Sequence, residues 1–202
     1  NKALRTLGWV DSDTYNTLSR EPINYSISSS NFIRAIACWV HIILGKDNPY
    51  YYSEYKIQTT YFEHQELTRN LIELFRIRFD PLIEYKKRPI SYKTLKNKIF
   101  EKIDEIIDKV ERTIYKESVN FIDNILKTNY FLTTKTGLAF RIDPEVLDPQ
   151  YYPHKPFGVF FIIGRDYRFF QIRWKDVARG GLRVVIPKNH TDYSIALSGI
   201  FD

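Results

Sequence analysis

Apolar positions recur every three or four residues in the first part of the chain, and this spacing predicts amphipathic helices. The first such segment covers residues 31–44, follows a serine run in which Ser29 or Ser30 would cap the helix, and stops before Gly45. Its apolar side chains leave little polar surface: Phe32, Ala35, Ile36, Cys38, Trp39, Val40, Ile42 and Ile43. A helix that is apolar on most sides is typical of a protein core, so we expect this helix to be buried.

A second helix is predicted over residues 65–79, where leucine and phenylalanine mark one face and Pro81 limits the end. The stretch between the two helices, residues 46–62, is rich in tyrosine and has no helical period, which predicts a loop and a short strand. Aromatic clusters of this kind can stack nucleic-acid bases. Because no arginine alternates with the tyrosines, we interpret them instead as a packed or interfacial aromatic surface.

A longer amphipathic pattern covers residues 91–127, with isoleucine and valine on one face and charged side chains between them. Its regularity breaks once near Ser118, so it predicts either one helix or two. The carboxylates of Asp104, Glu105 and Asp108 are close enough in sequence to suggest a catalytic pair, but they fall on the charged face, which predicts a solvated surface. The apolar face should bury Ile103 and Val110.

Short runs of β-branched and aromatic residues replace the helical pattern after residue 129. The runs LAFRI, GVFFIIG, YRFFQIRW and LRVVI are separated by glycine, proline and aspartate, which predicts strands joined by turns. The tripeptide GRD between the second and third runs is short enough for a hairpin. The pattern predicts an α+β fold, with a helical part at residues 1–130 and a β-rich part at residues 131–202 that begins an α/β domain.

Composition narrows the classes of function. The net charge of +6 permits an anionic partner, but lysines are spread among Asp and Glu instead of forming one stripe, so we expect no nucleic-acid binding. The longest apolar run, residues 35–44, is too short to span a bilayer, so no membrane segment is predicted. The chain contains no methionine and ends within SIALSGIFD, which resembles the middle of an element. We therefore expect it to be a piece of a longer protein.

Cysteine and histidine offer little chemistry. Cys38 is the one cysteine, so an internal disulfide is excluded, and its place in an apolar run predicts a buried core thiol. The four histidines lie far apart in sequence without the spacing of metal ligands, so no metal site is predicted.

The stretch WKDVARGGLRVVIP carries the most specific candidate chemistry. Gly180 and Gly181 remove two Cβ atoms, so the backbone can adopt positive φ, approach a ligand closely and present consecutive N–H groups to an anion. Arg179 and Arg183 flank them with planar guanidinium groups that match a carboxylate, and Lys175 adds positive charge nearby. The same residues also fit a glycine bulge or a hairpin corner with exposed arginines, and the residues alone leave both interpretations open.

Three segments resemble, in this order, the large NAD-specific glutamate dehydrogenases of fungi and protists: ILKTNYFLTTKTGLAFRIDP, PFGVFFIIGRDYRFFQIRWKDVARGGLRVV and DYSIALSGIFD. The resemblance covers about residues 30–202 and implies oxidation of L-glutamate to 2-oxoglutarate and ammonia, with hydride passing to NAD. In the smaller hexameric glutamate dehydrogenases, the lysine of a K-G-G-x-R loop holds a substrate carboxylate. The matching position here is Arg179, beside Gly180 and Gly181, with Arg183 supporting the loop. Arginine replaces lysine, which keeps the charge and changes its shape.

The same resemblance implies that the catalytic lysine, the general acid and the NAD-binding Rossmann domain lie outside this chain. We therefore expect no catalytic residue, no cofactor site and no activity in the chain alone. The partners it implies are glutamate and 2-oxoglutarate, in a full-length protein that is a homo-oligomer. The expected compartment is the cytoplasm, with the mitochondrion as the alternative. The alternative function is a non-enzymatic helical module for interaction or oligomerisation within a larger protein.

Overall fold

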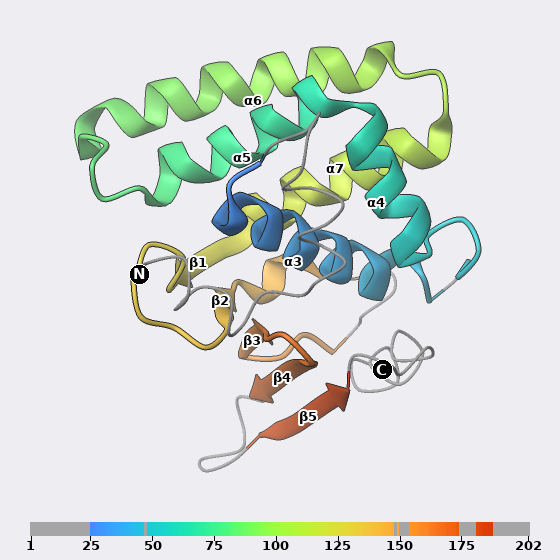
Figure 1. Ribbon diagram of the computed structural model, residues 1–202, viewed down its shortest axis with the longest axis vertical. Coiled ribbons are helices and arrows are strands. Elements are labelled where there is room, and N and C mark those ends of the chain that lie inside the picture. Colours follow the sequence, from blue (N-terminus) through green and yellow to red (C-terminus); the bar gives the residue numbers. More distant parts are fainter. Residues whose placement is uncertain (1–24, 47, 148, 150–153, 174–180, 188–202) are drawn as a thin grey trace.

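The structure is a computed structural model that describes residues 25–46, 48–147, 149, 154–173 and 181–187. Its helices are α3 (Ile27–Leu44), α4 (Glu54–Glu63), α5 (Gln65–Phe79), α6 (Arg88–Glu105) and α7 (Lys109–Asn124), with short 3-10 turns η1 (Tyr85–Lys87) and η2 (Pro144–Val146). Its strands are β1 (Ile125–Thr128), β2 (Leu138–Ile142), β3 (Gly158–Ile163), β4 (Tyr167–Arg173) and β5 (Leu182–Pro187). The helices come first along the chain and gather above the strands (Figure 1), so the fold is α+β, as the sequence predicts.

The strands form one five-stranded antiparallel sheet in chain order, so each strand pairs with its sequence neighbours. The Gly164 N–H donates to the Tyr167 carbonyl at 2.9 Å, which confirms the predicted hairpin between β3 and β4. Side chains alternate between the two faces of the sheet. On the face toward the helices, Phe140, Phe161 and Phe170 occupy paired positions and are buried.

Helix α3 lies between the sheet and the other helices and is buried along most of its length, as predicted. The Trp39 ring lies 5.2 Å from Phe121 of α7 and 6.0 Å from Phe161 of β3, centroid to centroid, so helices and sheet share one core. By length and composition α3 could cross a membrane, since the helix extends beyond the apolar run at residues 35–44. However, 72% of this helix is buried inside the protein, as the central helix of a core would be.

The first helix begins earlier than the sequence predicts. Helix α3 starts at Ile27, and its cap is Ser26 instead of Ser29 or Ser30. The Ser26 Oγ accepts a hydrogen bond from the Ser29 N–H at 3.1 Å. Several consecutive serines offer the same capping oxygen, so the hydropathy pattern does not distinguish among them.

The segment after the first helix contains helix α4, where the sequence predicts a loop and a short strand. Ser53 caps this helix by accepting a backbone N–H of the first turn. The buried residues of the helix are Ile57, Thr60 and Tyr61. Because this face includes a threonine and a tyrosine, the helical period carries little hydropathy signal. The Tyr61 hydroxyl lies 2.6 Å from Ser118 Oγ of α7, so a distant polar contact stabilises the helix. Of the neighbouring tyrosines, Tyr50, Tyr51 and Tyr55 are exposed.

The long amphipathic pattern divides into α6 and α7 at residues 106–108, not near Ser118. Asp108 caps α7, and its carboxylate accepts hydrogen bonds from two backbone N–H groups of the first turn. Ser118 lies inside α7, where its buried hydroxyl donates to the Ile114 carbonyl at 2.6 Å. A serine that bonds back to its own helix in this way does not interrupt it.

Among the residues named in the prediction, all but one have the expected exposure. Ile103 is fully buried, and Asp104, Glu105 and Asp108 are exposed. Val110 is only half-buried, where the sequence predicts burial, because it lies in the first turn of α7 directly after the connection from α6.

Helix α7 ends at Asn124 and continues directly into β1, where the sequence predicts helix up to residue 127. Ile125 pairs with Ile142 of β2, so hydrogen bonding to the sheet replaces the last helical turn. Strand β1 therefore belongs to the sheet although it precedes residue 130.

Candidate functional site

The glycine-arginine stretch follows β4 and includes β5, and these two strands are adjacent and antiparallel. Gly181 and Arg183 belong to the described residues, whereas Lys175, Arg179 and Gly180 lie outside them. The ladder between β4 and β5 holds the described ends of the stretch in register. A ligand bound by this stretch would therefore lie at the end of the β4–β5 pair, where β4 ends and β5 begins.

Gly181 occupies a position that has no room for a side chain. Its φ is 158°, and an added Cβ would lie 2.3 Å from the Ile172 carbonyl oxygen and 3.3 Å from Arg173 Cγ. Glycine permits this close approach because it has no Cβ. The described β4–β5 ladder starts at the next residue and continues without a register shift, so Gly181 marks the hairpin corner and not a bulge within the ladder.

Arg183 is exposed on the face of the sheet that points away from the helices, opposite Gln171 of β4. Arg173, at the end of β4, is exposed as well. The Phe157 N–H donates to the Arg173 carbonyl at 2.7 Å, which ties the end of β4 to the residue that precedes β3. The exposed arginines of β4 and β5, Arg173 and Arg183, thus each lie next to the last described pair of the β4–β5 ladder, and their positive charge favours anions.

A buried polar cluster joins β4 to helices α3 and α4, and the sequence predictions do not include it. Arg168 has 6% of its side chain exposed and donates to both carboxylate oxygens of Glu54, at 2.7 and 2.8 Å. Its Nε donates to Cys38 Sγ at 3.1 Å. Burial raises the pKa of the Cys38 thiol to about 12, so this core thiol stays protonated. The signal in the sequence is the alternation in YRFFQIR, which places Arg168 on the same face as Phe170 and Ile172.

The hairpin between β3 and β4 is held from the helical side by a second arginine. Arg34 of α3 donates from one terminal nitrogen to the carbonyls of Gly164 and Arg165, at 2.8 and 3.1 Å. Arg34 of α3 therefore holds β4 near its first residue. The pairing of β4 with β5 extends from there to Leu182, next to Gly181.

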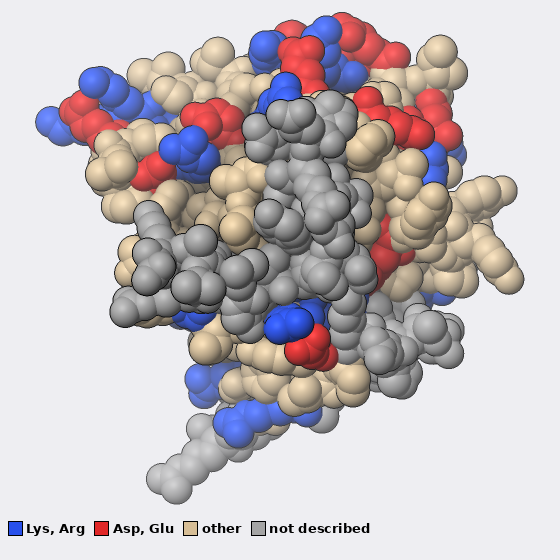
Figure 2. Space-filling model, in the orientation of Figure 1, with Lys and Arg blue, Asp and Glu red and all other residues tan. Residues whose placement is uncertain are grey.

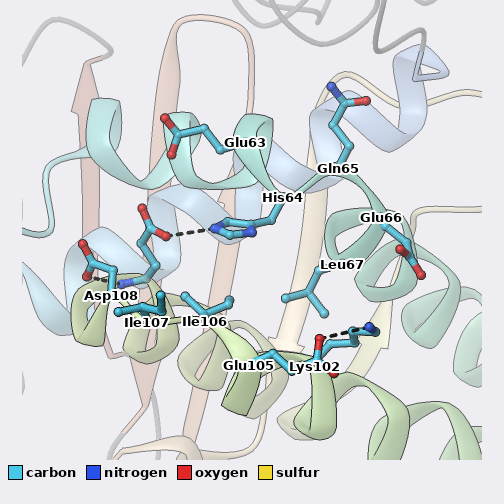
Figure 3. A pocket seen from close by; sticks show the side chains of 11 residues that line it. Glu63, His64, Gln65, Glu66, Leu67, Lys102, Glu105, Ile106, Ile107 and Asp108 are labelled. Carbon is cyan, nitrogen blue, oxygen red and sulfur yellow. Dashed lines mark hydrogen bonds and ion pairs between the residues drawn. The ribbon is translucent and has the colours of Figure 1, made fainter.

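A hollow of about 620 Å³ lies between the α4–α5 corner and the α6–α7 corner (Figure 3). Lys56 Nζ and His64 Nε2 lie 2.8 and 2.9 Å from the two carboxylate oxygens of Glu111. Burial alone would raise the pKa of Glu111, but the hydrogen bonds and charges of Lys56 and His64 outweigh it and lower the pKa. Among the described residues, no group of three or more His, Cys, Asp or Glu is placed to hold a metal ion. Lys56, His64 and Glu111 thus form an ion-paired cluster where α4, α5 and α7 meet.

Residues 98–200 match the family model for the catalytic domain of bacterial NAD-glutamate dehydrogenase, a range that contains α7, the whole sheet and the stretch between β4 and β5. This chain belongs to the NAD-glutamate dehydrogenase family. It is 38% identical over 95 residues to glutamate dehydrogenase 2 of Dictyostelium discoideum and 38% identical over 96 residues to the NAD-specific glutamate dehydrogenase of Saccharomyces cerevisiae. The family resemblance of the sequence is thereby confirmed.

Each of these two alignments covers 47% of this chain and 9% of the relative. The NAD-specific glutamate dehydrogenase of Halomonas elongata is 28% identical over 199 residues, which is 96% of this chain and 12% of the relative. The chain thus spans about a tenth of the length of the glutamate dehydrogenases that it matches.

Proposed function

We propose that the chain is part of an NAD-dependent glutamate dehydrogenase that oxidises L-glutamate to 2-oxoglutarate and ammonia, with NAD as hydride acceptor. The observation that carries this proposal is the family match over residues 98–200, which includes the sheet and the stretch between β4 and β5. The names of the relatives specify NAD. In the full-length enzyme, NAD binds to a domain outside this chain. The lysine that takes part in catalysis also lies outside this chain.

Within this chain, Arg179 and the backbone at Gly180 and Gly181 bind a carboxylate of the substrate, and Arg183 supports the loop. The geometry of the described end of the loop supports this role, because the corner at Gly181 admits no side chain and exposed arginines lie near it. A carboxylate is the anion that an oxidative deamination of glutamate must orient, and a planar guanidinium matches it bidentately. The chain alone is inactive, since it supplies one side of the substrate site.

At the level of the whole enzyme, we propose a homo-oligomer in the cytoplasm. The exposed tyrosines Tyr50, Tyr51 and Tyr55 support the oligomer, because exposed aromatic side chains are enriched where protein surfaces meet. A subunit interface at these tyrosines is compatible with catalysis in another part of the polypeptide.

The test is the steady-state kinetics of Arg179→Ala in the full-length enzyme, with glutamate and NAD varied separately. Loss of a charge-assisted contact worth about 1.5–3 kcal/mol lowers kcat/KM for glutamate by about 10- to 150-fold. The KM for NAD should stay unchanged, because the nucleotide binds elsewhere. Arg165→Ala is the matched control, since Arg165 is exposed at the opposite end of β4. Glutamate kinetics equal to those of the control would contradict the role of Arg179.

A further inference from the structure

The sheet has a second face, which points away from the described helices. Cross-strand pairing arranges the side chains of this face in two neighbouring rows. The first, named the apolar row, comprises Ala139, Ile162, Phe169 and Val185 on β2 to β5. The second, named the basic row, comprises Lys127, Arg141, Phe160, Gln171 and Arg183 on β1 to β5.

Both rows are accessible within the described part of the chain. Val185 is 63% exposed, while Phe160, Ile162 and Phe169 are half-buried. A hollow of about 430 Å³ opens on this face, with Ala139, Phe160 and Ile162 among its lining residues. Neighbouring strands lie about 4.8 Å apart, so the apolar row is roughly 14 Å long, enough for several partner side chains in a line.

The charge of this face has one sign. The five described strands contain no Asp or Glu, and the basic row ends in Lys127 and Arg141 on one side and in Arg183 on the other. Over the helices, in contrast, Lys and Arg lie among Asp and Glu (Figure 2). A partner that places apolar side chains on the apolar row would bring its adjacent positions over the basic row, where carboxylates are favoured.

We propose that the apolar and basic rows form the docking surface for an acidic amphipathic segment of the same enzyme polypeptide, outside these 202 residues. The inference rests on the proposed function, which places the chain in a longer dehydrogenase. Two observations identify the occupant. The relatives extend far beyond the matched region, which is 9–12% of their length, so most of their polypeptide is available to cover this face. The uniform positive charge selects a segment with carboxylates beside its apolar side chains.

Single-stranded nucleic acid also binds aromatic and basic sheet faces, but it fits these rows less well. The Arg141 guanidinium lies over the Phe160 ring, 5.9 Å from its centroid, and so occupies a ring face on which a base would stack. The apolar row consists mainly of the aliphatic side chains of Ala139, Ile162 and Val185, which offer methyl groups instead of ring faces. A protein segment uses both rows, whereas a nucleic acid would leave much of the apolar row uncovered.

The test is thiol labelling of cysteine variants of the full-length enzyme with a maleimide, measured by mass spectrometry of the peptide that contains each site. Val185→Cys reports on the apolar row, and Leu82→Cys is the control, because Leu82 is 92% exposed between α5 and α6. Docking of a segment should make labelling at residue 185 at least about tenfold slower than at residue 82. Reversing two charges of the basic row, with Lys127→Glu and Arg141→Glu together, should restore labelling to within about threefold of the control, whereas Lys127→Arg with Arg141→Lys should preserve the protection.

Labelling of Val185→Cys as fast as that of Leu82→Cys would overturn the proposal. Protection that disappears when the enzyme is diluted to single subunits would assign the surface to a second copy instead. Protection that requires added oligothymidylate would assign it to nucleic acid. Should Val185→Cys fail to fold, Ala139→Cys at the other end of the apolar row gives the same comparison between the charge-reversed and charge-preserving variants. Glutamate oxidation measured in the same preparations tests the proposed function separately, because it does not depend on the labelling result.

Discussion

Replacing Glu54 with glutamine should destabilise the protein far more than replacing a surface carboxylate, because it leaves the buried charge of Arg168 unbalanced. The Arg168 side chain is 6% exposed and that of Glu54 is 27% exposed. Removing one member of a buried ion pair typically costs 3–5 kcal/mol. Glutamine retains an acceptor oxygen and the Glu54 position is partly hydrated, so we expect a loss of about 2–3 kcal/mol in the free energy of unfolding.

The assay is equilibrium unfolding in urea, followed by tryptophan fluorescence, to which the buried Trp39 contributes. With a slope of about 2 kcal/mol per molar urea, the midpoint should fall by roughly 1–1.5 M at constant slope. Glu84→Gln is the matched control, because Glu84 forms a surface pair with Lys87 and 57% of its side chain is exposed. Its cost should stay within about 0.5 kcal/mol.

Equal midpoints for Glu54→Gln and Glu84→Gln would refute this reasoning, since they would mean that solvent already balances the Arg168 charge. A double-mutant cycle gives an independent check. Arg168→Met removes the charge itself, so the cost of Glu54→Gln should largely disappear in that background.

Three further predictions concern the core, the corner and pH. Ile103→Ala should cost about 2–5 kcal/mol, while Ile107→Ala, at a 96% exposed position, should cost at most about 0.5 kcal/mol; equal costs in urea unfolding would contradict the core position of Ile103. Gly181→Ala should lower Tm well below that of Gly158→Ala, because an added Cβ meets a carbonyl oxygen at 2.3 Å in the first case and only a ring carbon at 3.8 Å in the second; a smaller loss for Gly181→Ala would refute the crowded corner. The pKa of Glu111 is lowered in the folded state, so its contribution to stability is complete above the unfolded pKa of about 4.3 and is lost as pH falls through the folded pKa. The difference in unfolding free energy between the protein and Glu111→Gln should therefore shrink from pH 5 toward about pH 3, and a constant difference would argue against the ion pair.

Where hydropathy and burial agree, the sequence predicts the fold well. The helix at residues 65–79 matches the structure closely because its apolar positions follow the helical period. The strands LAFRI and GVFFII also match, because they are short β-branched and aromatic runs between turn residues. Helix α4 could not be predicted in this way, since the face it buries includes Thr60 and Tyr61. The Thr60 hydroxyl donates to the Lys56 carbonyl one turn earlier, and the Tyr61 hydroxyl contacts Ser118, which is 57 residues away in sequence. The break between α6 and α7 at residues 106–108 could not be predicted either, because Ile106 continues the apolar period up to Asp108, which caps α7.

For the candidate site, the chemistry of single residues was accessible from the sequence, whereas their partners were not. The double glycine predicts a backbone that can adopt positive φ, and the φ of Gly181 is 158°. Arg179 and Gly180 lie outside the described residues, so their contact with a carboxylate stays a prediction. Alternation places Arg168 on the buried face, but its partner Glu54 lies 114 residues away, and no local pattern connects residues at such a separation.

The central position of α3 has a consequence for how the protein is made. Trp39 leaves the ribosome more than one hundred residues before Phe161 and Phe170, the sheet residues against which it packs. At synthesis rates of about 5–20 residues per second, α3, the most apolar of the described helices, is made roughly 6–25 s before the strands that pack against it. Once all strands have been synthesised, the sheet should form quickly, because each strand pairs with its sequence neighbour. Nascent chains that stop between α7 and β3 should therefore bind chaperones through α3, and they should be released when β4 has emerged.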